Sequence, residues 1–470
     1  MTIQAGQQPA TSPVPPTHMR AALAALRIRP IPATSKGFGR LAAAGRAPGA
    51  GNPGAGAGIP GVAGDTGADG TVTSASLAER RPYLLGPDFT LPVLVLREEA
   101  LRQNITAMAG YCASAGVGLA PHGKTTMAPQ IMARQLAAGA WGMTAATIAQ
   151  VQVYRAFGVP TVLIANELAD RGGIEWLAAE LAADPGFECY AYVDSAAGVR
   201  LLDEWLRTGG ARRPLPVLVE LGQPGGRAGC RSIDGALAVA QAIASAGLLR
   251  LAGAAGFEGN IHADSAAATV AAVAGFCRDL RTLGDLLPAD PAGTPHLLSA
   301  GGSAYFDIVA AELTAARPGH PRPEVLIRSG AYVTHDHGLY AAIGPGAGQQ
   351  GRTGPALVPA LELWAPVLSR PEPGLAVASA GRRDTGFDQG LPVPLRIRHA
   401  DGRESPAGPL RVTKLDDQHA HLSVPEESPL AAGDLICLGI SHPCTTFDKW
   451  RVIPVVDEEY RVIDAIHTFF

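Results

Sequence analysis

The chain has 470 residues, of which 47% are hydrophobic and 17% are charged, so it can hold more than one domain and a large core. Its formal net charge of −4, from 38 basic and 42 acidic residues, excludes a general electrostatic attraction to nucleic acids or anionic membranes. No apolar run approaches the roughly 18 residues that a bilayer-spanning helix needs. We therefore expect a soluble globular protein without a nucleic-acid or membrane partner.

The six cysteines are widely spaced and form no Cys-x-x-Cys pair. A disulfide framework is usually dense and short, so this spacing indicates a reducing compartment. We expect a cytoplasmic protein.

Residues 1–78 are dominated by alanine, glycine and proline, including a Gly-Ala-Gly-Ala-Gly run at 54–58. Such a segment buries too little apolar area to offset the entropy lost on ordering, so we expect a disordered N-terminal extension. Two alternatives are an over-long start and a transit peptide, the latter because Arg20, Arg27, Arg29 and Arg40 occur without early acidic residues.

Residues 92–350 alternate short apolar strands with alanine-rich amphipathic helices, which is typical of βαβ units and a parallel sheet. Two such helices are expected at 128–138 and 148–157, each followed by a glycine stop. Eight units over this length predict an α/β fold, a (β/α)8 TIM-type barrel, with an open doubly wound sheet as the alternative. The expected strands are 117–120, 141–145, 161–165, 189–193, 217–221, 251–257, 296–300 and 325–329.

Residues 355–470 lose the helical periodicity and predict a C-terminal antiparallel β domain. Residues 91–97, which precede the first barrel helix, are a candidate additional strand of this domain. The strand-like segments are 361–368, 375–379, 410–413, 420–424, 434–439 and 450–456.

The first barrel strand is followed by Pro121-His122-Gly123-Lys124-Thr125, which places a lysine at the C-terminal end of an apolar run. Active sites of such barrels lie at these strand ends, and a lysine there can have a lowered pKa and act as a nucleophile or base. The alternative is an ordinary surface lysine on a loop.

The last two strands are followed by Ser299-Ala300-Gly301-Gly302-Ser303 and Ser329-Gly330-Ala331-Tyr332. Glycines let backbone N–H groups approach an anion closely, and late barrel loops are common phosphate sites. A plain glycine turn is the alternative. A lysine and a phosphate site on one rim together indicate pyridoxal 5′-phosphate (PLP), bound through a Schiff base.

The β domain carries Ser-His-Pro-Cys-Thr-Thr-Phe-Asp-Lys-Trp at 441–450. In an extended segment His442 and Cys444 lie on the same side, and imidazole with thiolate suits Zn2+ or another divalent cation. The alternative is a buried cysteine beside a hydrogen-bonded histidine.

Pro-His-Gly-Lys-Thr, Arg-Ala-Gly at 227–229, Ser-Ala-Gly-Gly-Ser and the 441–450 segment together resemble the D-serine dehydratase and D-threonine aldolase family over about residues 85–470. These are fold-type III PLP enzymes with an alanine racemase-like barrel and a β domain. The resemblance implies that Lys124 carries the cofactor, Arg227 lies near its phenolic oxygen, and His442 and Cys444 bind the metal. The remaining expected cofactor-binding residues are His122, Ser299, Gly301, Gly302, Ser303, Gly330 and Tyr332.

Dehydratase-type members have His-x-Cys at the metal, whereas aldolase-type members have His-x-Asp, so the resemblance favours a zinc-dependent lyase acting on D-3-hydroxy amino acids such as D-serine. It would release a 2-oxo acid and ammonia. One alternative is an aldolase that gives glycine and an aldehyde, and another is a non-catalytic PLP-binding protein. The resemblance also implies a homodimer.

Overall fold

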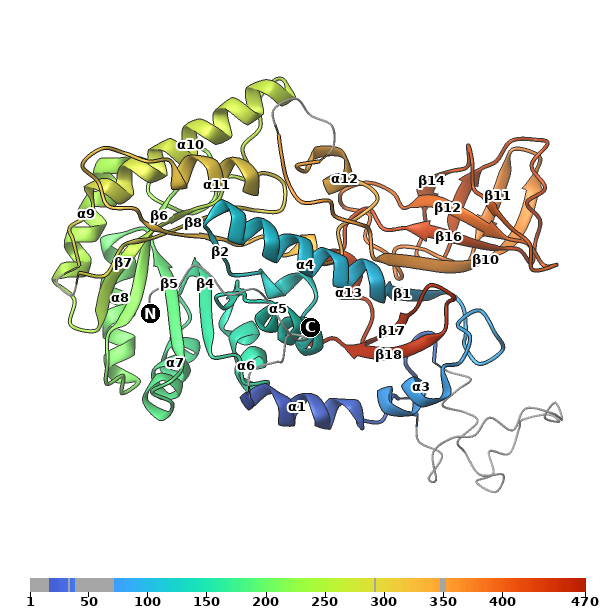
Figure 1. Cartoon of the computed structure of the whole chain (residues 1–470), viewed down its shortest axis with the longest axis horizontal. Coiled ribbons are helices and arrows are strands. Elements are labelled where there is room, and N and C mark those ends of the chain that lie inside the picture. Colours follow the sequence, from blue (N-terminus) through green and yellow to red (C-terminus); the bar gives the residue numbers. More distant parts are fainter. Residues whose placement is uncertain (1–16, 33, 39–71, 291–292, 347–351) are drawn as a thin grey trace.

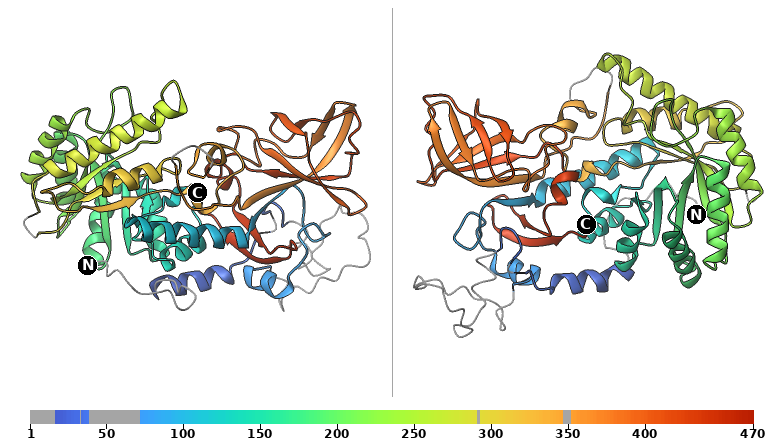
Figure 2. Two further views of the ribbon diagram at one scale, coloured as in Figure 1. Left: turned by 45° about the horizontal axis from the view of Figure 1, so that its top comes forward. Right: turned by 180° about the vertical axis from the view of Figure 1, so that it is seen from behind.

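A parallel barrel lies beside a mostly antiparallel β domain in the computed structural model, which describes residues 17–32, 34–38, 72–290, 293–346 and 352–470 (Figure 1). Helix α4 (Glu98–Ala115) runs from the barrel toward the β domain, and the two turned views show the same arrangement (Figure 2). Apolar residues of both units belong to one continuous core.

The barrel contains eight parallel strands in the order β2-β9-β8-β7-β6-β5-β4-β3. Their residues are β2 (Gly118–Leu119), β3 (Met143–Ala145), β4 (Thr161–Glu167), β5 (Glu188–Val193), β6 (Leu215–Leu221), β7 (Leu249–Gly256), β8 (Leu297–Ala300) and β9 (Glu324–Ile327). A parallel bridge between His122 and Thr144 joins the ends of β2 and β3. The bridge brings the two outer strands together, so the barrel prediction is confirmed over the open sheet.

Helices follow the strands on the outside of the barrel, as the βα alternation predicts (Figure 1). They are α5 (Pro129–Ala137), α6 (Ile148–Ala156), α7 (Arg171–Ala183), α8 (Ala196–Thr208), α9 (Ile233–Ala244), α10 (Ala266–Leu286) and α11 (Phe306–Thr314). Side-chain oxygens cap the backbone N–H groups at the start of five of them, from Thr147, Asp170, Ser195, Ser232 and Ser265. Within the described part of the chain, no helix combines the length and apolarity that a bilayer crossing requires.

The β domain has a sheet in the order β13-β12-β16-β10-β1-β17-β18, to which β11, β14 and β15 are attached through β10. Its strands are β10 (Leu361–Glu372), β11 (Leu375–Ala378), β12 (Val393–Arg398), β13 (Glu404–Pro406), β14 (Arg411–Leu415), β15 (Ala420–Ser423), β16 (Leu435–Gly439), β17 (Val452–Val456) and β18 (Val462–His467). Strand β1 (Val93–Arg97) pairs antiparallel with β10 and parallel with β17, as expected for residues 91–97. Strands β12, β13 and β18 were not predicted, because charged or proline residues interrupt their apolar alternation.

The expectation of a disordered 1–78 extension does not hold for its described residues, while residues 1–16, 33 and 39–71 lie outside the description. Helix α1 (Thr17–Arg27) packs near α5, and α3 (Ser74–Arg80) packs on β18. Met19 and Phe38 are completely buried. The reason is tertiary: these few apolar residues find a partner surface that local composition does not reveal.

Three short helical segments follow the barrel strands β2 and β9 near the rim of the barrel. They are the 3-10 turns η1 (Gly123–Thr125) and η2 (Ala331–Val333) and the helix α12 (Leu339–Ile343). From the β domain, the four-residue helix α13 (Cys444–Phe447) reaches η1. The β domain therefore supplies side chains to the same rim as the strand ends.

Candidate functional site

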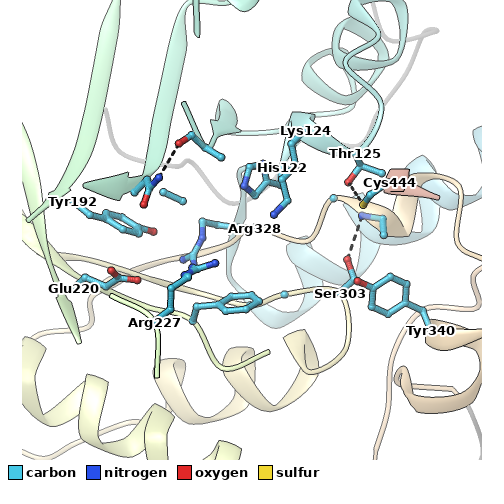
Figure 3. Close-up of a pocket in the computed structure, with 18 residues that line it drawn as sticks. His122, Lys124, Thr125, Tyr192, Glu220, Arg227, Ser303, Arg328, Tyr340 and Cys444 are labelled. Atoms are coloured by element: carbon cyan, nitrogen blue, oxygen red, sulfur yellow. Dashed lines mark hydrogen bonds between the residues drawn. The ribbon is translucent and has the colours of Figure 1, made fainter. Parts of the chain in front are cut away.

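A pocket of about 220 Å³ lies at the C-terminal ends of the barrel strands, and helix α13 of the β domain contributes to its wall. Expected site residues on this wall are His122, Lys124, Arg227, Gly301, Gly302, Ser303, Gly330 and Cys444. Figure 3 shows the Lys124 and His122 side chains pointing into the pocket, with Tyr192 and Glu220 at one end and Cys444 and Tyr340 at the other. The structure thus brings together residues that are separated by more than 300 positions in the chain.

Lys124 lies on η1, where the chain leaves β2 and turns into the pocket. Lys124 remains solvent-accessible from the pocket, although surrounding protein atoms exclude part of the water around its amine. Burial lowers the Lys124 pKa; the nearby Cys444 acts in the opposite direction, and the guanidinium groups of Arg227 and Arg328 add to the lowering. A lowered pKa makes the neutral amine, which is the nucleophilic and basic form, more available.

Two arginines and one glutamate complete the charged lining. The buried Arg328 donates from Nη1 to Ser299 Oγ at 2.7 Å and from Nη2 to the Gly256 carbonyl at 2.7 Å. The Arg227 guanidinium lies over the Phe257 ring, 5.1 Å from its centre. The three cationic side chains Lys124, Arg227 and Arg328 outnumber the one acidic side chain, Glu220. The pocket is therefore suited to an anion.

The glycine loop after β8 differs from the expected phosphate cradle. The completely buried Glu258 accepts the backbone N–H of Gly301 at 2.9 Å and of Gly302 at 2.6 Å. Glu258 comes just after β7, the strand beside β8, so its carboxylate can reach both amides. These two amides are therefore occupied by a protein group. The groups left to meet an anion at this end are Ser303, Gly330 and Tyr340.

Three expected site residues lie behind the pocket wall rather than on it. Ser299 is completely buried and holds Arg328, as described above. Tyr332 on η2 points into the core, where its hydroxyl accepts a hydrogen bond from Gln135 of α5 at 3.0 Å. His442 lies beside Cys444 without lining the pocket itself.

His442 and Cys444 form the expected pair in the β domain. The Cys444 thiol donates to Thr125 Oγ1 at 3.4 Å, which connects α13 with the turn that carries Lys124. His442 Nδ1 lies 2.7 Å from Asp388 Oδ2. Burial opposes protonation of His442, but its hydrogen bonds to Cys444 and Asp388 outweigh burial and raise the pKa to about 9.

The donor chemistry of this pair fits a divalent cation that keeps water or substrate as further ligands. Imidazole nitrogen and thiolate sulfur are the ligands that zinc prefers. In the described part of the chain, no set of three histidine, cysteine or acidic side chains is arranged to hold a metal. The pair alone would therefore leave most coordination positions open.

Among the charged and tyrosine residues of the pocket, four were missed by the sequence analysis: Tyr192, Glu220, Arg328 and Tyr340. The first three stand within or directly after apolar strands, so the rule that singled out Lys124 was able to find them. Tyr340 had no such signal, because it reaches the pocket only through α12. There the buried Asp336 accepts the Gly338 and Tyr340 backbone N–H groups at 2.9 and 3.0 Å and holds the start of the helix.

Buried polar atoms without a protein partner also belong to residues of the pocket wall, at His122 Nδ1 and Tyr192 Oη. Such atoms are costly to bury unless a ligand or water satisfies them. A Cβ at Gly330 would lie 2.5 Å from the His122 carbonyl oxygen, so only glycine permits this close packing. The pocket therefore fits a ligand that is anionic and rich in hydrogen-bonding groups.

The chain is similar to known proteins in sequence and in fold. A family model described as "Putative serine dehydratase domain" matches residues 360–456. A D-threonine aldolase from Arthrobacter sp. is 26% identical over 368 residues, which cover 78% of this chain and 88% of that protein.

Solved structures are similar over most of their length. The D-threonine aldolase from Filomicrobium marinum is 27% identical, with a TM-score of 0.66 over 81% of this chain and 95% of that one. The D-threo-3-hydroxyaspartate dehydratase from Delftia sp. HT23 is 21% identical, with a TM-score of 0.61 over 81% and 97%, and supports the fold. The chain is thus similar to D-threonine aldolases over most of its length, and its β domain matches the serine dehydratase model.

Proposed function

We propose that the protein is a PLP-dependent lyase that converts D-3-hydroxy amino acids, with D-serine as the representative substrate, to a 2-oxo acid and ammonia. One observation carries the proposal: the amine of Lys124 and the thiol of Cys444, from different domains, line one pocket. An amine nucleophile beside a metal-binding thiol is the combination that this elimination requires.

Several residues fit the cofactor. Lys124 would bind its aldehyde carbon, Arg227 would face its phenolic oxygen, and Ser303, Gly330 and Tyr340 would surround its phosphate. When bound, PLP supplies an electron sink for negative charge that develops at the substrate Cα.

The Lys124 amine then has a second task, which its lowered pKa supports. As a neutral base it would take the Cα proton, and the ammonium form would later return a proton. The water lost from Cα and Cβ is regained when the released enamine hydrolyses, so D-serine gives pyruvate and ammonia in balance.

His442 and Cys444 would hold a divalent cation, most simply Zn2+, next to Lys124. Such a cation polarises the bond from Cβ to its hydroxyl group and makes hydroxide a better leaving group. Thr125 would keep the two domains in register at this point: it accepts from the Cys444 thiol in the structure, and its hydroxyl would donate to a metal-bound thiolate.

The test is product analysis with the purified protein, PLP and Zn2+. We expect pyruvate and ammonia from D-serine, no product from L-serine, and loss of turnover in Lys124→Ala. The variant should also lose the visible absorbance of the bound cofactor, whereas the surface variant Lys414→Ala should keep both properties. Absence of ketoacid and ammonia from every D-3-hydroxy amino acid would contradict the proposal.

A D-threonine aldolase is the second candidate, and it is favoured by the two aldolases that are 26% and 27% identical to this chain. Here the same site would break the bond between Cα and Cβ. Glycine and acetaldehyde from D-threonine, without 2-oxobutanoate, would establish this reaction instead.

A further inference from the structure

The loop between β11 and β12 presents Asp388 to the expected metal pair. Its Oδ2 lies 2.7 Å from His442 Nδ1, and its Oδ1 accepts the Thr445 hydroxyl at 2.5 Å. Both carboxylate oxygens therefore bind the short segment that carries His442 and Cys444.

This contact decides which ring nitrogen of His442 can bind a cation. A histidine that donates Nδ1–H to a carboxylate has its lone pair at Nε2, on the other side of the ring. The carboxylate also makes the ring a stronger ligand. We propose that Asp388 is a positioning residue, which holds the His442 ring so that Nε2 and the Cys444 sulfur face one divalent cation; this inference rests on the proposed function.

The loop is itself anchored on both sides of Asp388, so the carboxylate is held before any cation arrives. The Gly386 N–H donates to Thr446 Oγ1 at 2.9 Å, and the buried Trp450 ring donates from Nε1 to the Asp384 carbonyl at 2.8 Å. After Asp388, the Gly390 carbonyl accepts the Ser441 hydroxyl at 2.5 Å. These bonds tie the loop to the same segment of the chain, 441–450.

A structural role alone does not account for the contact. The Asp388 side chain is 41% exposed, and an ion pair at such a position contributes little to folding stability. Its two oxygens are already taken by His442 and Thr445, so it is poorly placed as a third metal ligand. Asp388 should therefore matter for cation affinity much more than for stability.

The experiment measures Zn2+ affinity of the metal-stripped full-length protein by competition with a chromophoric chelator. We expect Asp388→Ala to weaken Zn2+ binding about 10- to 100-fold, as is typical of lost partners of metal-binding histidines. Asp388→Asn keeps an acceptor oxygen for Nδ1–H and should lose clearly less. The matched control is Asp448→Ala, whose side chain is 43% exposed and lies in the same segment; its affinity should not change.

Unfolding midpoints of all variants in urea complete the test, since a positioning role leaves them unchanged. Asp388→Ala with the affinity of the unsubstituted protein would overturn the inference, as would equal losses in Asp388→Ala and Asp448→Ala. His442→Ala and Cys444→Ala distinguish failure of the Asp388 positioning role from failure of the metal site itself. If they lose Zn2+ while Asp388→Ala does not, only the positioning role fails; if they keep it, the metal site of the proposed function fails.

Discussion

At the scale of single residues, Glu220 on the pocket wall has a neighbouring carboxyl group, and the proposed reaction uses neither of them. Glu167 at the end of β4 lies beside Glu220 of β6, and burial together with this neighbour raises the Glu167 pKa to about 8. Glu167 Oε1 and Glu220 Oε2 are both buried without a hydrogen-bond partner when both carboxyl groups are ionised. Protonation of one carboxyl group would let it donate to the other. A shared proton at neutral pH resolves both observations.

This raised pKa predicts a pH-dependent stability. The unfolded state loses its Glu167 proton near its ordinary pKa of 4.5, whereas the folded state retains it until about pH 8. Stability from this group is thus complete below pH 4.5 and decreases as the pH rises to 8.

Glu167→Gln mimics the protonated acid and should be more stable than the unsubstituted protein at pH 9, by about 1 to 2 kcal/mol after solvent screening. The advantage should disappear near pH 4.5. Urea unfolding at both pH values measures it, with Glu188→Gln at an exposed position of β5 as control. An equal effect at both pH values would contradict the shared proton.

At the scale of elements, strand β1 connects two of the apolar clusters among the described residues. Leu94 and Leu96 pack in the core that includes the barrel, while Val93 and Val95 pack in the core that contains Phe38 and neighbouring residues. Alternate residues of a strand point to opposite faces, so one five-residue strand serves both. It also supplies pairing partners to β10 and β17, which would otherwise each have an open edge.

Shortening a β1 side chain should therefore destabilise the whole protein. We expect Leu94→Ala, at a completely buried position, to reduce the free energy of unfolding by about 2 to 5 kcal/mol. Val393→Ala at a 37% exposed position of β12 should change it by less than about 0.5 kcal/mol. Thermal or urea unfolding tests both, and two similar small effects would show that β1 is not central to the core.

At the scale of the whole molecule, the N-terminal residues connect elements that are distant in the chain. Lys36 forms an ion pair with Asp384 at 3.1 Å and lies 4.8 Å from the centre of the Trp450 ring, next to the loop that carries Asp388. Phe38 packs edge to face on Phe89, with ring centres 5.8 Å apart. Residues 34–38 are thus part of the folded protein rather than of a tail.

Substitution of Phe38 tests this view. Phe38→Ala should lower the free energy of unfolding by about 3 to 5 kcal/mol, because a completely buried ring is lost. Ile28→Ala, in the same segment but 68% exposed, is the control and should have little effect. If Phe38→Ala behaves like the control, the N-terminal segment does not contribute to stability.

The sequence alone determined where the eight barrel strands lie along the chain and that Lys124 stands at the end of one of them. Apolar strands that alternate with capped amphipathic helices allow few topologies, so eight strands were predicted close to their observed positions. Lys124 was evident because a charged residue ended an apolar run. Strand β1 was also anticipated, since its alternation survives outside the barrel.

Only the tertiary structure decided how the site is completed. The Gly301 and Gly302 amides pair with Glu258, Tyr332 points into the core, and Tyr340 enters the pocket through a helix without any sequence signal. The proximity of Cys444 to Thr125, and of Asp388 to His442, joins segments 319 and 54 residues apart. Local sequence patterns indicate which face of a helix or strand is buried. Which residues meet across a long stretch of chain depends on how the complete helices and strands pack together.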